Sequence, residues 1–260
     1  MCEIFGISAN FPCVINDYLK TFYSHSSLHP HGWGLAYRAE ENSSALKIYK
    51  GKEPAFKSKY LAEKLSEPVV TDLALAHIRY ATIGNVEFKN CHPHKKADRL
   101  GHQWTLIHNG TIFDFKPLDK FISYQSGDTD SERILLYIVD EVNKKQGQLY
   151  RGLSPQERFM LIDEIICRMS KGNKLNLILY DGEFMYVHTN YANSLYFLNK
   201  GDCALFSTQP LSPENWQNVP FTTLVVYKWG KQVFTGTNHN NEYIENEENL
   251  KYLYQIFSNL

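Results

Sequence analysis

The sequence predicts an α+β protein in which helices pack on stacked, mostly antiparallel sheets, with residues 1–260 forming a single domain. Three observations support this prediction. Predicted strands come first, two long helices occupy the middle of the chain, and strands follow again. Asp181-Gly182 separates two apolar segments, which is a strong signal for a tight β-hairpin. The 17 tyrosines and 15 phenylalanines favour sheets with aromatic cross-strand pairs.

The first half of the chain is predicted to alternate short strands and helices. A strand is expected over residues 2–9, with Cys2 at its exposed start. Apolar residues spaced at i, i+4 and i+7 predict a helix over residues 14–23. Two later apolar runs are typical of buried strands, and the second ends in the turn signal Asn109-Gly110. The predicted hairpin, short helix and two buried strands span residues 33–39 with 46–49, 57–65, 73–79 and 104–108.

The second half contains the two long helices and the later strands. Thr129 and Glu132 have the spacing of a capping box, which predicts a helix to about residue 145. Ser154-Pro155 with Glu157 gives the same signal, with proline at the first helical position, for a helix to about residue 171. The strands predicted next, followed by a terminal amphipathic helix, span residues 175–180, 183–189, 194–198, 204–207, 223–227, 232–237 and 250–257.

Composition and charge argue against several classes of function. The formal net charge is −1, so no basic surface for nucleic acid or an anionic membrane is expected. No apolar run approaches the ~20 residues of a membrane-spanning helix. The first residues also lack the basic and apolar regions of a secretory signal. The five cysteines are scattered without a C-x-x-C pair, which argues against a disulfide framework. We therefore expect a cytoplasmic protein without nucleic-acid or membrane partners.

Cys2 is the first candidate for chemistry because it directly follows the initiator methionine. Removal of Met1 would leave a thiol and a free α-amine on the same residue. Their ordinary pKa values, about 8.5 and about 7.7–8.0, are close enough for the amine to accept the thiol proton through one water. This pairing is the N-terminal form of nucleophilic catalysis. Position alone leaves open the alternative of a packed cysteine without a chemical role.

Polar residues at the ends of predicted strands and in loops supply further candidates. Arg79 offers a guanidinium fork suited to a substrate carboxylate. Asn109 and Gly110 offer an amide side chain and an unhindered backbone N–H, which are the groups of an oxyanion hole. Asp130, at the start of a helix, is placed to accept a hydrogen bond from a substrate ammonium. The alternatives are a surface ion pair, a type I′ turn and a helix-dipole role, respectively.

Two His-Pro-His stretches, His29-Pro30-His31 and His92-Pro93-His94, invite a metal-site hypothesis. The proline between each pair holds the flanking residues extended, and neither pair has the i, i+4 spacing of a helical H-E-x-x-H site. Both stretches are therefore expected to be ordinary loops, with one histidine near a functional site, and no bound metal is expected.

Six short motifs occur in order along the first half of the chain: Met1-Cys2-Glu3-Ile4-Phe5-Gly6, His31-Gly32-Trp33-Gly34, His77-Ile78-Arg79-Tyr80-Ala81-Thr82, Asn90-Cys91-His92-Pro93, His108-Asn109-Gly110 and Asp128-Thr129-Asp130-Ser131-Glu132. Together they resemble the class II glutamine amidotransferases, which are N-terminal-nucleophile hydrolases. The chain is most similar to the stand-alone branch of about this size. That branch is akin to amidohydrolases acting on γ-glutamyl compounds in ergothioneine synthesis and glutathione breakdown. A later stretch, Ser207-Thr208-Gln209-Pro210-Leu211 with Trp216, extends the resemblance over nearly the whole chain.

The resemblance implies a four-layer αββα sandwich and hydrolysis of the side-chain amide of glutamine or of a γ-glutamyl compound. It implies that Cys2 attacks the amide carbonyl, that its α-amine moves the proton, and that Asn109 and Gly110 stabilise the oxyanion. Neither a metal nor an organic cofactor is implied. The substrate-binding residues that the resemblance implies are Arg79 for the α-carboxylate, Asp130 for the α-ammonium, and Thr82 and His92 in the pocket lining.

Two departures limit this transfer. Glucosamine-phosphate synthases have Arg-Trp-Ala-Thr-His-Gly where this chain has Arg79-Tyr80-Ala81-Thr82-Ile83-Gly84, so contacts of that tryptophan and second histidine do not carry over. The 260 residues leave no room for a synthase domain, so either a separate ammonia-accepting subunit or simple hydrolysis is expected. A catalytically silent regulatory subunit of the same fold and a histidine-ligated metal hydrolase are the alternatives, and homo-oligomer formation stays open.

Overall fold

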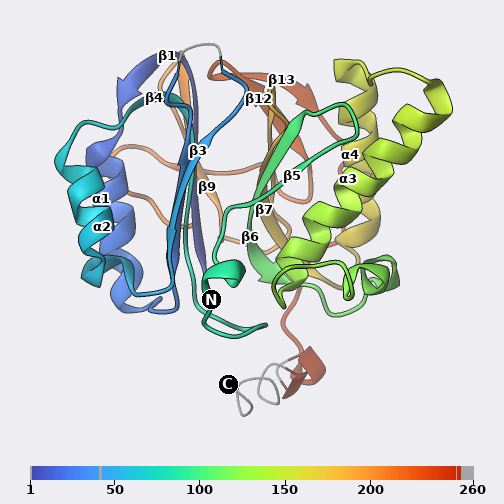
Figure 1. The fold of residues 1–260 in the computed structure, drawn as a ribbon, viewed down its shortest axis with the longest axis horizontal. Helices are drawn as coiled ribbons and strands as arrows, with labels where there is room; N and C mark the ends of the chain where they lie inside the picture. The colour runs from blue at the N-terminus through green and yellow to red at the C-terminus, as the bar shows by residue number, and fades with distance from the viewer. Residues whose placement is uncertain (1, 41–42, 250, 253–260) are drawn as a thin grey trace.

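Two antiparallel β-sheets packed face to face form the centre of the molecule, and helices cover their outer faces (Figure 1). This is a computed structural model that describes residues 2–40, 43–249 and 251–252. α1 (Asn16–Ser24) and α2 (Lys59–Ser66) lie outside one sheet, and α3 (Asp130–Leu149) and α4 (Pro155–Met169) lie outside the other. The predicted α+β class and the four-layer αββα sandwich are confirmed.

Each of the two sheets combines strands that are far apart in the chain. The seven-stranded sheet has the order β11-β9-β10-β1-β4-β2-β3, and the six-stranded sheet has the order β13-β12-β8-β7-β6-β5. The strands of the first sheet are β1 (Glu3–Val14), β2 (Trp33–Tyr37), β3 (Lys47–Gly51), β4 (Val70–Ile78), β9 (Tyr196–Asn199), β10 (Cys203–Ser207) and β11 (Gln217–Asn218). Those of the second are β5 (His94–Ala97), β6 (Gln103–Thr111), β7 (Lys174–Tyr180), β8 (Met185–His188), β12 (Val225–Lys228) and β13 (Lys231–Thr235). Short 3₁₀ helices lie at His25–Ser27, Ala55–Lys57, Phe88–Asn90 and Lys116–Phe121.

The period-two alternation of the strands decides which side chains enter the layer between the sheets. On β4, Leu75 packs between the two sheets, whereas Ala74 and Ala76 pack beneath α1 and α2. On β6, Ile107 packs between the sheets and Leu106 packs beneath α3 and α4. The layer between the sheets is apolar along most of its length. Polar side chains that face this layer at the strand ends therefore indicate where a functional site can form.

β1 is longer than the sequence predicted. The strand expected over residues 2–9 continues to Val14, and the helix expected from residue 14 begins only at Asn16. The physical reason is a β-bulge after Ser8, beyond which Cys13 pairs with Thr71 in β4. A bulge changes the register without ending the strand, and the helical spacing of the next apolar residues concealed this continuation.

One turn signal was wrong, and a second gave the right hairpin with too short a loop. Asn109 and Gly110 were predicted to form a turn, but both lie inside β6 and pair with Asn176 and Leu175 of β7. The Asp181-Gly182 hairpin does form, but its connection is longer, because Tyr180 is the last residue to pair and its partner is Met185. The Asp181 side chain accepts hydrogen bonds from the backbone N–H groups of Glu183 and Phe184, at 2.9 and 2.7 Å, which stabilises the longer loop.

Both long helices begin where their capping residues predicted. The Thr129 hydroxyl accepts from the Glu132 N–H at 3.2 Å, and Ser154 with Glu157 forms a complete capping box. In α3 the Glu132 carboxylate instead accepts from the N–H groups of Ser126 and Gly127, so it fixes the loop before the helix. Two strands, β5 and the short β11, were not predicted. The amphipathic helix predicted over residues 250–257 falls largely outside the described residues.

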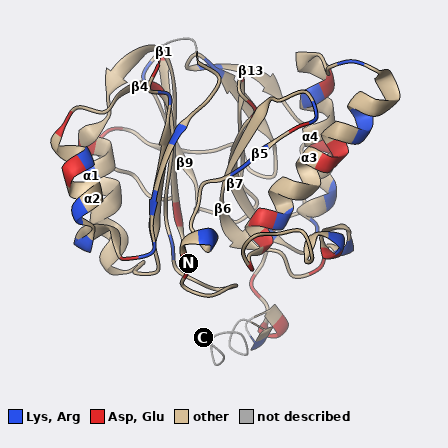
Figure 2. Cartoon of the chain, viewed as in Figure 1, with Lys and Arg blue, Asp and Glu red and all other residues tan. Residues whose placement is uncertain are grey.

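Charges of both signs are distributed over the outer helices. In Figure 2, basic and acidic residues are interspersed along α3, in keeping with the net charge of −1. Within the described part of the chain, no helix combines the length and the apolar character needed to cross a membrane.

Gly34 in β2 offers a test of how closely β2 packs against the segment that carries His92. A Cβ atom at this position would lie 1.8 Å from the carbonyl oxygen of His92, so Gly34→Ala must displace the segment that carries His92. We expect a loss of about 1–3 kcal/mol in the free energy of unfolding, measured by denaturant titration. Gly152→Ala is the matched control, since its Cβ would meet only Leu100 at 3.4 Å. Equal stability of the two variants would contradict the assigned packing.

Candidate active site

Cys2 lies at the end of the sheet where β1 begins and β4 ends. β1 begins with Glu3 opposite Ile78, the last residue of β4, so Cys2 faces the segment that follows β4. Its Sγ donates to the Tyr80 carbonyl at 3.3 Å and accepts from the Tyr80 N–H at 3.4 Å. Burial raises the pKa of the Cys2 thiol, and the hydrogen bond with Tyr80 and the charge of Arg79 act in the opposite direction. The thiol is therefore the resting form.

A small cavity beside Cys2 brings together most of the residues predicted from the sequence. It has a volume of about 20 Å³. The predicted site residues that line it are Cys2, Arg79, Thr82, His92, Gly110 and Asp130. Asn109 lies outside this cavity and instead lines a wider cleft of about 690 Å³, to which Cys2 also contributes. Cys2 therefore stands where an enclosed pocket and an open cleft meet.

Arg79 is a buried residue with several hydrogen bonds to the backbone. Its side chain is 3% exposed, so the alternative of a surface ion pair is wrong. The guanidinium donates to the carbonyl oxygens of Ile83, Gly84 and Asn85 at 3.0, 2.8 and 2.9 Å. These bonds compensate for the loss of water around a charge that cannot be neutralised by deprotonation. They also fold the 83–85 loop over the guanidinium.

Asn109 and Gly110 face opposite sides of β6. Asn109 is 3% exposed, and its buried Oδ1 has no hydrogen-bond partner among the described residues. Gly110 is required by packing, because a Cβ there would lie 2.0 Å from the Lys174 carbonyl oxygen and 2.5 Å from Nε2 of His108. The amide side chain and the glycine are thus adjacent at the strand end nearest Cys2, although no turn presents them.

Asp130 joins the end of β6 to the start of α3. Its Oδ2 accepts from the Ile112 N–H at 2.9 Å, and its Oδ1 accepts from the Ser131 N–H at 2.9 Å. Asp130 is the first residue of α3, where a carboxylate also interacts favourably with the helix dipole. A carboxylate accepts about four hydrogen bonds, so acceptor capacity remains for a ligand.

Four buried histidines line or adjoin the same end of the sheets: His77, His92, His94 and His108. The ring of His92 contacts those of His77 and His94, with centroids 4.0 and 4.6 Å apart. Burial and neighbouring positive charges lower the pKa of His92 well below its usual range and that of His94 to about 3, so these rings are neutral at pH 7. The His92-Pro93 peptide bond is cis. His92 and His94 are buried and His94 is the first residue of β5, so the prediction of an ordinary loop for this stretch was wrong.

The other His-Pro-His stretch serves a different network. Glu3 is 2% exposed and accepts from His25, His29 and Gln209 at 2.8, 3.1 and 2.8 Å. The His31 Nδ1 accepts from the Ala81 N–H at 2.9 Å. Sequence patterns did not indicate this Glu3 network, because its members lie far apart in the chain. Among the residues that the structure describes, no group of three or more His, Cys, Asp or Glu side chains could hold a metal ion.

Comparison with known proteins shows which family the chain belongs to. The model of the family described as glutamine amidotransferases class-II matches residues 1–202. An uncharacterized protein, MJ1515 of Methanocaldococcus jannaschii, is 24% identical, with 90% of this chain and 71% of that protein covered. "Putative glutamine amidotransferase YafJ" of Escherichia coli is 26% identical, with 73% of this chain and 74% of that protein covered.

A solved structure shares the fold. It is titled a "predicted glutamine amidotransferase" from Pseudomonas aeruginosa, and it superposes with a TM-score of 0.59 at 18% identity over 90% of this chain and 100% of that chain. At this identity the likeness supports the fold alone. Since the family model spans more than half of the sequence, however, the chain belongs to the class II glutamine amidotransferases, whose general chemistry is hydrolysis or transfer of the glutamine amide.

Proposed function

We propose that this chain hydrolyses the side-chain amide of glutamine or of a γ-glutamyl compound through a thioester on Cys2. The observation that carries this proposal is the position of Cys2 between two cavities. Attack on an amide carbon separates an acyl group from a leaving amine. Arg79 and Asp130 stand on the enclosed side, where they suit the two charges of a glutamyl group, and the wide cleft accommodates the leaving amine.

The proposed reaction uses groups of this chain alone. Removal of Met1 frees the α-amine of Cys2, which takes the thiol proton through a water molecule. The thiolate attacks the amide carbon, and the resulting oxyanion accepts hydrogen bonds from the Asn109 side chain and the Gly110 N–H. The C–N bond breaks as the nitrogen takes up the proton and leaves. Water then adds to the thioester, the C–S bond breaks, and the γ-carboxylate and the thiol are formed.

In the proposed roles, Arg79 and Asp130 would bind the substrate in addition to the hydrogen bonds that they already make within the protein. Arg79 has five N–H donors, and three hydrogen bonds to the 83–85 loop are already formed. A substrate carboxylate would use the remaining donors or replace a loop carbonyl. Since the enclosed cavity is only about 20 Å³, we expect substrate binding to move the 83–85 loop away from the guanidinium.

Cys2→Ala should abolish hydrolysis of glutamine and of γ-glutamyl amides while the fold is retained, because it removes only the nucleophile. The measurement is intact mass before and after exposure to a diazo-ketone glutamine analogue. We expect the wild-type chain to lack the Met1 mass and to gain one adduct, and the variant to gain none. Cys167→Ala, which alters a cysteine of α4, is the control and should be labelled normally. Wild-type turnover by Cys2→Ala would rule out the nucleophile.

Asn109→Ala should lower kcat by about 10²–10³ with little change in KM, because an oxyanion donor acts mainly in the transition state. Steady-state kinetics at saturating glutamine would show this. Asn10→Ala, an exposed position on β1, is the matched control. A kcat within a few-fold of the control would remove Asn109 from the oxyanion hole.

Arg79→Lys should mainly raise KM, since an ammonium replaces a planar fork at a carboxylate site. It should also lower Tm, because one ammonium cannot reproduce all three bonds to the 83–85 loop. Kinetics and thermal unfolding are measured on the same sample. A lower Tm with an unchanged KM would leave Arg79 a purely structural residue.

A further inference from the structure

Two buried polar atoms of residues that line the wide cleft beside Cys2 have no hydrogen-bond partner among the described residues. They are Oδ1 of Asn109, whose amide serves the proposed oxyanion hole, and Nδ1 of His29. Burying a polar atom without a partner is unfavourable, so each such atom in a folded protein needs an explanation. The proposed reaction gives one for Asn109 and none for His29.

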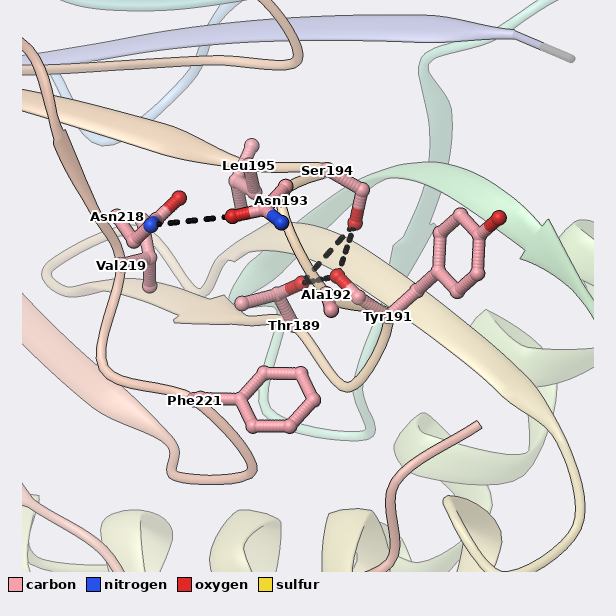
Figure 3. A pocket seen from close by; sticks show the side chains of 9 residues that line it. All are labelled: Thr189, Tyr191, Ala192, Asn193, Ser194, Leu195, Asn218, Val219 and Phe221. Carbon is pink, nitrogen blue, oxygen red and sulfur yellow. Dashed lines mark hydrogen bonds between the residues drawn. The ribbon is translucent and has the colours of Figure 1, made fainter. Parts of the chain in front are cut away.

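Other polar side chains of the cleft are bonded within the protein. The Ser194 hydroxyl donates to the Tyr191 carbonyl at 2.5 Å, and the Asn193 side-chain oxygen accepts from Asn218 at 3.3 Å (Figure 3). These groups would have to give up a bond before they could bind a molecule in the cleft. The unpaired nitrogen of His29 can accept a hydrogen bond without such a loss.

Glu3 determines which nitrogen of His29 carries a proton. Its carboxylate is 2% exposed and lies 3.1 Å from Nε2 of His29 and 2.8 Å from Nδ1 of His25. Burial acts to raise the pKa of Glu3, but the hydrogen bonds with His29 and His25 lower it below its ordinary value, so the carboxylate is ionised at pH 7. An ionised carboxylate only accepts hydrogen bonds. Nε2 of His29 therefore carries the proton, and in the neutral ring Nδ1 has the lone pair of a base.

His29 lies on the open side of Cys2. Its ring contacts that of Tyr80 edge to face, with centroids 6.4 Å apart, and the Tyr80 N–H donates to Sγ of Cys2 at 3.4 Å. Glu3 follows Cys2 directly in the chain and lines the same cleft of about 690 Å³. Among the described residues, His29 lines this cleft and is not part of the small enclosed cavity. His29 thus lies on the side from which water would approach a thioester on Cys2.

We propose that His29, held by Glu3, is the base that takes a proton from the water that hydrolyses the Cys2 thioester. This inference rests on the proposed function, which assigns no group to that proton. The water oxygen bonds to the thioester carbon as one of its protons passes to Nδ1. The C–S bond then breaks, the sulfur takes the proton from Nδ1, and the γ-carboxyl group is released and ionises. Glu3 is a positioning residue, because its charge fixes the ring and stabilises the transient imidazolium.

The test separates the two halves of the reaction, with glutamine as substrate. His29→Asn should leave formation of the thioester intact and slow its hydrolysis by about 10²–10⁴, the usual contribution of a general base. Rapid acid quench and intact mass should then show a larger fraction of γ-glutamyl-Cys2 in the variant than in the wild-type chain. In the steady state kcat and KM should fall together, so kcat/KM stays within a few-fold of the wild-type value.

Two further measurements address the base and its positioning. Hydroxylamine is a stronger nucleophile than water and needs no base to attack a thioester, so it should restore most of the turnover of His29→Asn. Glu3→Gln removes the charge but keeps the shape, and it should slow thioester hydrolysis in the same direction and by less. His102→Asn, which changes an exposed histidine, is the control and should match the wild-type chain.

The outcomes separate this inference from the function on which it rests. Thioester hydrolysis at the wild-type rate in His29→Asn would overturn the inference and leave the hydrolase intact. An equal fall in kcat and kcat/KM without accumulated thioester would also overturn it, because His29 would then be a structural residue. A wild-type chain that neither forms the thioester nor hydrolyses glutamine would overturn the proposed function as well. If His29→Asn does not fold, His29→Gln is measured in its place and the same criteria apply.

Discussion

The antiparallel pairing of β1 with β4 is the constraint on which the rest of the site depends. It sets Glu3 opposite Ile78 and Ile4 opposite His77, so Cys2 reaches the backbone of Tyr80. A shift of one residue would exchange the two faces of β1. Cys2 would then turn toward α1 and α2, and Glu3 would enter the inter-sheet layer. Because β1 is also bonded to β10 on its other edge, this register is fixed from both sides.

The site forms where the layer between the sheets changes from apolar to polar. Most of this layer consists of residues such as Ile107 and Ile178. At the Cys2 end, histidines and Arg79 take their place. Burial is tolerable for the histidines because they stay neutral, and for Arg79 because loop carbonyls replace its water. Preorganised polar groups in a water-poor site interact more strongly with a developing charge than they would in water.

The sequence predicted the layers, both long helices and the grouping of Cys2, Arg79 and Asp130, because periodicity, capping residues and ordered motifs are local signals. It did not predict that β1 continues to Val14 or that Asn109 lies within a strand. Strand ends depend on the partner strand, which no local pattern reveals. The Glu3 network was missed for the same reason, since it joins residues that the fold alone brings together. His77 and His108, isolated polar residues within apolar runs, were the overlooked signal for the buried histidines.

The burial of the Cys2 thiol bears on how the protein withstands oxidants. Burial disfavours the charged form of the sulfur, and the hydrogen bond with Tyr80 and the charge of Arg79 offset only part of this effect. The pKa of the Cys2 thiol is therefore raised, which keeps the thiolate scarce in the resting protein. Sulfenic and sulfinic acids form from the thiolate, so a nucleophile held as a thiol should resist peroxide far better than one held permanently ionised. If Cys2 is the nucleophile, as proposed, reactivity would arise only when substrate and base are both in place, and the thiol would persist through intervals of oxidative stress.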